Sequence, residues 1–173
     1  KDYLNMEEDE KIKTILKINK SANIDLLTDD TLRDVFESMR TIKDVQKLNG
    51  EYGCNRYIIS HCTTATDMME VYGLLKLSGW KADNLTVDIV PLFETIEDLQ
   101  AAGEVMKKLY SNKQYRQHIK NRADTQTIML GFSDGTKDGG YLMANWCIYK
   151  AKEELTRISR DYDIDVIFFE GRG

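Results

Sequence analysis

Short β-branched runs alternate with long amphipathic stretches over the part of the sequence that follows Gly53. The runs occupy residues 56–60, 85–90, 127–130 and 164–169. Helical patterns fill the intervals, at 65–77, at 96–122 in two pieces, and at 140–162. Strands that alternate with helices predict an α/β fold, with parallel pairing through right-handed crossovers.

The length of each repeat limits the choice of architecture. Successive strand ends are separated by about 35 residues, close to one βα unit of a barrel that takes about 250 residues for eight units. A chain of 173 residues is too short for the whole barrel, so four units would make half of one. Flavodoxin-like sheets share the same alternation, and periodicity alone leaves both architectures open.

The first fifty residues have a different pattern, which predicts two helices joined by a loop near 22–27. Ile12, Ile15 and Leu16 lie among charges in the first stretch, 6–20. The second stretch repeats apolar residues at helical spacing from Leu32 to Ile42, after the helix-start signal at 28–30. We therefore expect one segment, 1–173, with a helical lead-in at 1–52 and βα units at 53–173.

Composition excludes several classes of protein. Hydrophobic residues at 42% and charged residues at 31% are typical of a globular chain. The net charge of −5 argues against a general nucleic-acid binder. No apolar run approaches the roughly 18 residues of a membrane span, and the charged first twenty residues do not resemble a signal peptide. We expect a cytoplasmic protein without a membrane partner.

The three cysteines, Cys54, Cys62 and Cys147, lack the spacing of a zinc site or a disulfide framework. We expect reduced packing residues.

Polar residues gather directly after the strand runs. Glu94 follows the second run and Asp134 the third. At the carboxyl ends of neighbouring parallel strands, two such carboxylates can converge on a hard cation such as Mg²⁺ or Mn²⁺. The alternative is structural: Glu94 precedes a helix capped by Thr95, and Asp134 shapes a glycine-rich turn. On spacing alone, the structural explanation is the commoner one.

Two cations lie in glycine-rich segments of the same edge. Lys137 belongs to the stretch 133–140, a candidate anion-binding loop before a helix, although it matches neither the P-loop nor GxGxxG. Arg172 stands between two glycines, and its guanidinium suits a phosphate or carboxylate. A solvated loop arginine is the alternative.

Other side chains of interest have ordinary explanations. His61 follows the first strand and is a ligand, a base or a packing residue. His118, in the basic stretch 113–122, is predicted on a solvated helix face. Trp146, Tyr141 and Tyr149 share a helix with smaller apolar residues, a stripe more typical of core than of a cofactor site.

Five ordered strings give a family resemblance. They are YIIS at 57–60, IVPLFET at 89–95, GFSD at 131–134 with KDGGY at 137–141, ANW at 144–146, and FEGRG at 169–173. In order and spacing they resemble phosphoenolpyruvate carboxylase over essentially the whole chain. The resemblance implies part of a (β/α)₈ TIM barrel preceded by two helices.

The resemblance also implies a function. Phosphoenolpyruvate carboxylases are cytoplasmic lyases, usually homotetramers, that fix carbon dioxide as bicarbonate. They use Mg²⁺ or Mn²⁺ and produce phosphate and oxaloacetate, an intermediate of the tricarboxylic acid cycle. Glu94 and Asp134 match the metal ligands of the family, which reverses the balance that spacing alone had given. Lys137 and Arg172 match residues near the substrate anions.

One position departs from the family. Glu170 stands where the family has a histidine that assists proton handling. A carboxylate can accept a proton, but a neighbouring dianionic phosphate repels it unless Arg172 or a metal compensates.

Several catalytic groups of the family lie outside residues 1–173, so we expect the isolated segment to be inactive without the rest of a parent chain. The alternative is a non-catalytic partial barrel that binds phosphate ligands or serves as an assembly surface.

Overall fold

The computed structural model describes residues 2–171, which divide into two compact units. Within these residues, the first unit comprises 2–56 and 69–87, and the second comprises 57–68 and 88–171. No helix among the described residues is both long enough and apolar enough to cross a membrane.

The first unit contains the two predicted lead-in helices. They are α1 (Glu8–Leu16) and α2 (Asp30–Asn49), with short 3₁₀ turns at Tyr3–Asn5, Ile24–Leu26, Glu51–Gly53 and Ala82–Asn84. Asp29 caps α2 by accepting a 3.0 Å hydrogen bond from the Leu32 amide. Helix α3 (Ala65–Leu77) approaches α1 closely, because a Cβ on Gly73 would lie only 2.9 Å from Ile15 Cγ2.

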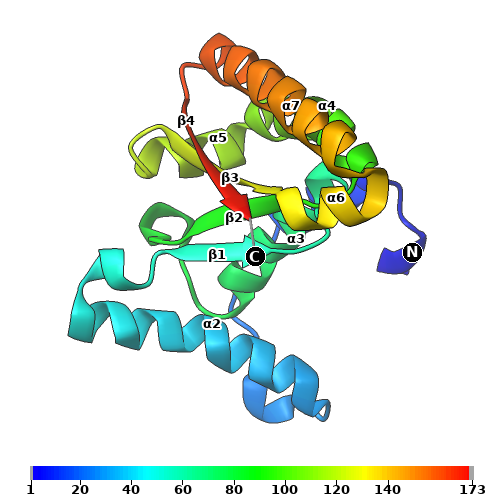
Figure 1. The fold of residues 1–173 in the computed structure, drawn as a ribbon. Helices are drawn as coiled ribbons and strands as arrows, with labels where there is room; N and C mark the ends of the chain where they lie inside the picture. Colours follow the sequence, from blue (N-terminus) through cyan, green and yellow to red (C-terminus); the bar gives the residue numbers. More distant parts are fainter. Residues whose placement is uncertain (1, 172–173) are drawn as a thin grey trace. The chain divides into compact units, whose positions relative to one another are not determined.

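The sheet has four strands in the order in which they occur in the chain (Figure 1). They are β1 (Arg56–Ile59), β2 (Asp88–Phe93), β3 (Thr125–Gly131) and β4 (Asp165–Gly171). Strand β3 pairs in parallel with both β2 and β4, and Met129 is the partner of both Leu92 and Phe169. Sequential order is that of a barrel wall, whereas a doubly wound sheet reverses its order at a switch point. The α/β prediction, with strands that form part of a barrel, is confirmed.

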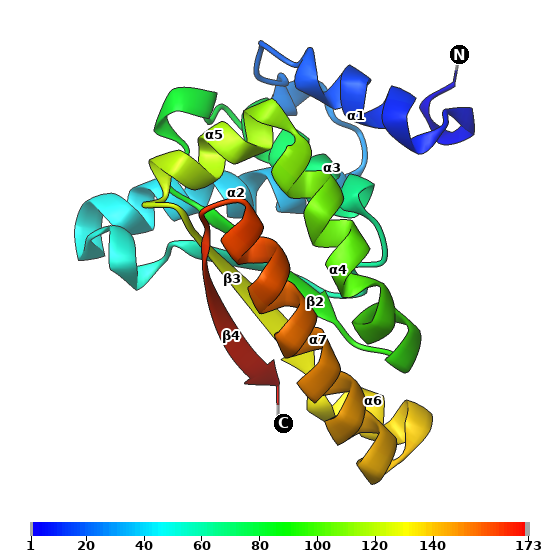
Figure 2. The same ribbon diagram turned by 90° about the horizontal axis from the view of Figure 1, so that it is seen from above.

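The helices of the second unit lie against one face of this sheet. They are α4 (Ile96–Ser111), α5 (Lys113–Asn121), α6 (Phe132–Gly139) and α7 (Tyr141–Asp161). Helices α4 and α7 run side by side (Figure 2). Gly103 allows the approach, because a Cβ there would lie 2.5 Å from Glu154 Cδ. On the other face, Ile167 and Phe169 of β4 are 46% and 54% exposed.

Two predicted boundaries are wrong. The second strand spans Asp88–Phe93 rather than 85–90. Leu85 and Val87 lie before the strand, and they are apolar because they are buried there, not because they belong to the sheet. The stretch 133–140 is not a loop: residues Phe132–Gly139 form α6, and only Gly140, at φ +81°, has a backbone that favours glycine.

Two predictions about side chains are also wrong. His118 is 3% exposed, because Tyr115, His118 and Ile119 share the buried face of α5 at helical spacing. Conversely, Trp146, Tyr141 and Tyr149 are all more than half exposed, and the buried face of α7 consists mainly of smaller residues such as Ala144, Cys147 and Ala151. Each error concerns which face of a correctly predicted helix meets the core.

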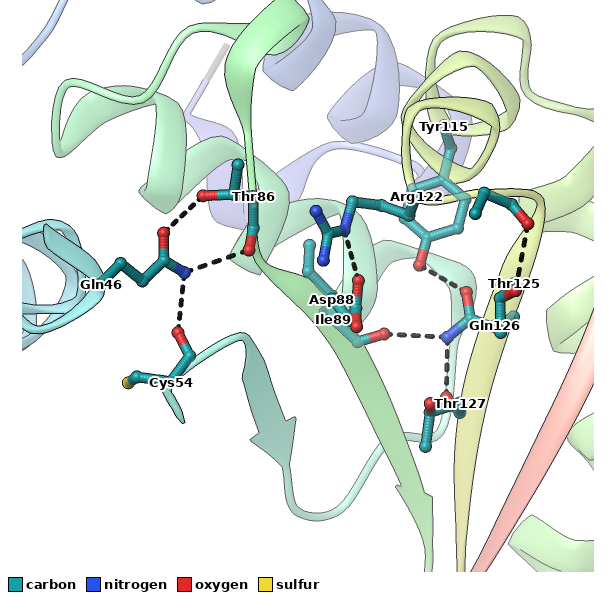
Figure 3. Close-up of polar contacts among 11 residues, drawn as sticks. Gln46, Cys54, Thr86, Asp88, Ile89, Tyr115, Arg122, Thr125, Gln126 and Thr127 are labelled. Carbon is teal, nitrogen blue, oxygen red and sulfur yellow. Dashed lines mark hydrogen bonds and ion pairs between the residues drawn. The ribbon is translucent and has the colours of Figure 1, made fainter. Parts of the chain in front are cut away.

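Buried polar side chains hold the amino ends of β2 and β3 (Figure 3). The Gln126 amide donates to the carbonyls of Ile89 (2.9 Å) and Thr127 (2.8 Å), and its oxygen accepts from the Tyr115 hydroxyl (3.1 Å). Beside it, Arg122 Nε donates to Asp88 Oδ1 at 2.6 Å. A satisfied network of this kind fixes the register of the strands.

A similar bridge occurs in the first unit, also drawn in Figure 3. Gln46 of α2 donates to the carbonyls of Cys54 (2.7 Å) and Thr86 (3.2 Å) and accepts from the Thr86 hydroxyl (2.6 Å). The Gln46 side chain thereby joins α2 to the backbone at Cys54 and at Thr86.

All three cysteines are free, and Cys62 and Cys147 are buried, as predicted for packing residues.

Candidate active site

Glu94 lies directly after β2, and the start of α4 fixes its backbone. Thr95 and Asp98 form a capping box: the Asp98 amide donates to Thr95 Oγ1, and the Thr95 amide donates to Asp98 Oδ2, both at 3.0 Å. The same carboxylate oxygen accepts a longer bond, 3.4 Å, from the Glu94 amide. The predicted cap at Thr95 is confirmed, and it holds the Glu94 main chain at the carboxyl end of β2.

Asp134 lies in the first turn of α6, directly after β3. Its Oδ1 is 3.2 Å from Lys137 Nζ, one turn further along the same helix. The two side chains are 48% and 77% exposed, so water competes with their ion pair. Helical geometry therefore brings this predicted metal ligand and this predicted anion ligand together in the structure.

Backbone packing brings the Glu94 segment next to the Asp134 segment. A Cβ on Gly131 would lie 3.0 Å from Glu94 Cα and 3.1 Å from the Phe93 carbonyl oxygen. A Cβ on Gly135 would lie 3.6 Å from the Glu94 carbonyl oxygen. The two glycines that flank Asp134 thus let the end of β3 approach the main chain of Glu94.

A further hydrogen bond joins the same two segments. Asp138 Oδ2, in the last turn of α6, accepts a 2.9 Å hydrogen bond from the Ile96 amide at the start of α4. An acidic side chain near a helix N-terminus is favourable because it satisfies an open amide and opposes the helix dipole. Both helices that follow the strands are therefore fixed to each other at this edge.

The donor set fits a hard divalent cation. Glu94 and Asp134 offer carboxylate oxygens, and Mg²⁺ commonly binds through one or two carboxylates together with water and substrate phosphate. No group of three or more histidine, cysteine, aspartate or glutamate residues among residues 2–171 is placed to hold a metal by itself. Two carboxylates match the number of protein ligands in a Mg²⁺ site that also binds water and a ligand.

Glu170 points toward the helices. Its carboxylate pairs with Lys152 of α7, and the Lys152 ammonium also lies 5.9 Å from the centre of the Phe168 ring. Glu170 and Phe168 alternate with the exposed Ile167 and Phe169 along β4. A role for Glu170 in proton handling stays a prediction. Arg172 lies outside the described residues.

The end of β1 provides little chemistry. His61 is exposed and has a positive φ of 51°. Burial raises the pKa of the neighbouring Cys62 thiol to about 12, and the carboxylates of Asp67 and Asp98 add to the effect. A thiol with such a pKa stays protonated at neutral pH and is a poor nucleophile.

Three positioning residues were not identified from the sequence: Asp98, Asp138 and Lys152. Asp98 had a local signal, because Thr95 and Asp98 have the spacing of a capping box. Asp138 and Lys152 had none, since their partners lie 42 and 18 residues away in the chain. Only the tertiary structure reveals such pairs.

Comparison with known families identifies the family of the chain. The family model described as phosphoenolpyruvate carboxylase matches residues 1–173, which is the whole of the sequence. The chain therefore belongs to the phosphoenolpyruvate carboxylase family.

Proposed function

We propose that this chain supplies the metal- and phosphate-binding edge of a phosphoenolpyruvate carboxylase active site. The observation that carries the proposal is the packing of Gly131 and Gly135 against the main chain of Glu94. It places the segment that bears Asp134 and Lys137 beside the residue expected to share a cation with Asp134. Membership of the family supports the same reading.

The reaction requires negative charge to be stabilised on three groups: the phosphate, the carboxylate and the enolate oxygen. A bicarbonate oxygen forms a bond to phosphorus as the bond between phosphorus and the enol oxygen breaks. The enolate carbon then forms a bond to the carboxyl carbon, and phosphate leaves. When bound, Mg²⁺ or Mn²⁺ supplies positive charge near the enolate and carboxylate oxygens.

In this reaction, the residues of the chain would bind and orient the cation and the substrate. Glu94 and Asp134 would hold the cation. Lys137, whose side chain is exposed, would leave its pair with Asp134 to meet the phosphate, and Arg172 would contact the same anion. Charge placed in advance around the developing anions is the main contribution that such groups make.

The test is a titration of the chain with Mn²⁺ by calorimetry, alone and with phosphoglycolate as an unreactive substrate analogue. Asp134→Ala should weaken Mn²⁺ binding at least tenfold, because one of two protein ligands is lost. Asp161→Ala is the matched control, since Asp161 also pairs with a cation one turn away on an exposed helix face. Equal Mn²⁺ affinity in both variants would contradict the proposal.

A second candidate function is a partial barrel that binds phosphate ligands without catalysis. The pairing of Glu170 with Lys152 favours it, because a carboxylate held by a helix lysine is a weaker proton carrier than a histidine. Replacing Glu170 by histidine in a parent enzyme that contains this segment distinguishes the two. An active parent whose carboxylation stays the same or falls on replacement supports a native role for Glu170, whereas a parent that is inactive, or active only with histidine, supports the non-catalytic reading.

A further inference from the structure

A group of lysines surrounds Trp80 in the first unit. Helix α3 ends there: the Trp80 amide donates to the Leu75 carbonyl (3.1 Å), and Gly79 has a φ of +95°. Trp80 is 6% exposed, its Nε1 donates to the Met39 carbonyl (3.1 Å), and Lys43 Nζ lies 4.6 Å from the ring centre. The indole ring is therefore held in one position by burial and by its hydrogen bond.

A depression of about 750 Å³ lies on one side of this tryptophan. It will be called the Lys76 depression. The polar residues that line it, together with Trp80, are Asn19, Lys20, Ser21, Lys76 and Lys81. No carboxylate is among the described residues that line it. A concave surface that carries three ammonium groups and no acid stands out in a chain whose net charge is −5.

The segment that carries Lys20 and Ser21 is fixed beside α3. The Ala22 amide donates to the Leu77 carbonyl at 2.8 Å, and Arg40 Nη2 donates to the Ala22 carbonyl at 3.3 Å. Lys76 Nζ donates to the Leu16 carbonyl at 3.4 Å, at the end of α1. The donors of the depression therefore come from segments that hydrogen bonds hold in place, which reduces the entropy lost when a ligand binds.

Positive charge extends beyond the depression itself. A second hollow, of about 510 Å³, also has Trp80 and Lys81 in its lining, together with Lys43, Lys47 and Glu51. Burial lowers the pKa of Lys43, and the charges of Lys47, Arg40 and Lys81 lower it further against the opposing effect of Asp44. Burial lowers the pKa of Lys76 as well. At Lys43, repulsion by these three cations thus adds to the effect of burial.

Helix capping explains only part of this cluster. Lys43 donates to the Gly79 carbonyl (2.6 Å) and Lys76 to that of Leu16, and both bonds complement the negative ends of helices. Lys20 and Lys81 are exposed and form no ion pair with any residue in the described part of the chain. Capping therefore gives no reason for these two charges to face the same hollow.

We propose that the Lys76 depression binds a small anion that carries two or more phosphate or carboxylate groups, through Lys20, Lys76 and Lys81. The Ser21 hydroxyl and the Asn19 amide would donate to the same oxygens. Nucleic acid is a poorer fit, because the net charge of −5 opposes a long polyanion. This site uses residues of the first unit alone and does not depend on the function proposed above.

The experiment uses Trp80 as the reporter. Trp80 and Trp146 are the two tryptophans, and Trp146 is 58% exposed, so Trp146→Phe leaves a single buried indole without disturbing the core. This variant is titrated with inorganic pyrophosphate in a buffer free of divalent cations, which keeps the Glu94 and Asp134 edge out of the measurement. We expect a saturable change in Trp80 emission, and the same dissociation constant by calorimetry.

Removing the lysine charges then tests whether pyrophosphate binds in the Lys76 depression. Lys20→Met with Lys81→Met, in the Trp146→Phe background, should raise the dissociation constant at least tenfold, and added salt should weaken binding in the unsubstituted background. Lys120→Met, an exposed lysine of α5, is the control and should leave binding unchanged. All three residues are exposed, so circular dichroism should remain constant. Absence of saturable binding by both methods, or equal affinity in the double variant and the control, overturns the proposal.

Discussion

The two ends of the strands in the second unit use polar residues in opposite ways. At the amino ends, Gln126 is buried and hydrogen-bonded through both its amide nitrogen and its oxygen, and Arg122 is closely paired with Asp88. At the carboxyl ends, Asp134 and Lys137 are largely exposed and paired only within one helix. Satisfied buried groups stabilise a fold, whereas exposed charges with weak partners remain available to a ligand. The difference separates residues that maintain the sheet from residues that can bind.

The largest effect on stability is expected at Gln126. Gln126→Ala removes the hydrogen bonds of Gln126 to the buried carbonyl of Ile89 and the hydroxyl of Tyr115, and should lower the free energy of unfolding by about 2–4 kcal/mol. Urea denaturation followed by circular dichroism measures it. Gln117→Ala removes an exposed glutamine whose side chain donates to Asn121, and should change stability by less than about 0.5 kcal/mol. Similar losses of stability in the two variants would contradict the stabilising role assigned to the buried polar groups at the amino ends of the strands.

The Arg122–Asp88 pair should come next. Their side chains are 12% and 19% exposed, so Arg122→Met leaves a carboxylate in a poorly solvated place and should cost about 2 kcal/mol. Arg157→Met breaks the exposed pair with Asp161 and should cost less than about 1 kcal/mol. Thermal unfolding at low and high salt tests both, and an Arg122 effect that salt abolishes would argue for an ordinary surface pair.

Two acids at the carboxyl ends should behave differently from each other. Asp98→Ala removes half of the capping box and should lower stability by about 1–2 kcal/mol. Asp134→Ala should lower it by less than about 0.5 kcal/mol, because its lysine partner is largely exposed. Denaturation midpoints of the two variants provide the measurement. A large loss at Asp134 would show that it maintains α6 rather than serving a ligand.

The smallest effect concerns Cys62, which lies at the carboxyl end of β1 yet is buried. Since burial raises its pKa from 9.0 to about 12, the folded thiol keeps its proton where the unfolded thiol loses it. This contribution to stability is complete below pH 9 and is lost as the pH rises toward 12. At pH 8, a thiol-specific reagent should modify half-buried Cys54 well before Cys62. Cys62→Ser is the control that identifies the slow thiol, and rapid modification of Cys62 would contradict the expectation.

Local signals in the sequence were sufficient for most of the elements, but they missed α6 and placed the second strand too early in the chain. The division of 96–122 into two helical pieces, the end of α3 before Gly79 and the cap at Thr95 all follow from short-range patterns, and the structure confirms them. The family strings identified Glu94, Asp134, Lys137, Glu170 and Arg172 as site residues, and their roles remain predictions. Helical periodicity alone did not fix the buried face of α5 or α7, because both faces of each helix carry large side chains.

The sequence by itself determined that strands alternate with helices and that acids and glycines follow the second and third strands. The tertiary structure decided that the strands lie in sequential order, that Gly131 and Gly135 meet the main chain of Glu94, and that Glu170 turns to Lys152. The physical reason is range: caps and helical periods depend on neighbours within a few residues, whereas strand order and paired charges depend on contacts between residues far apart in the chain.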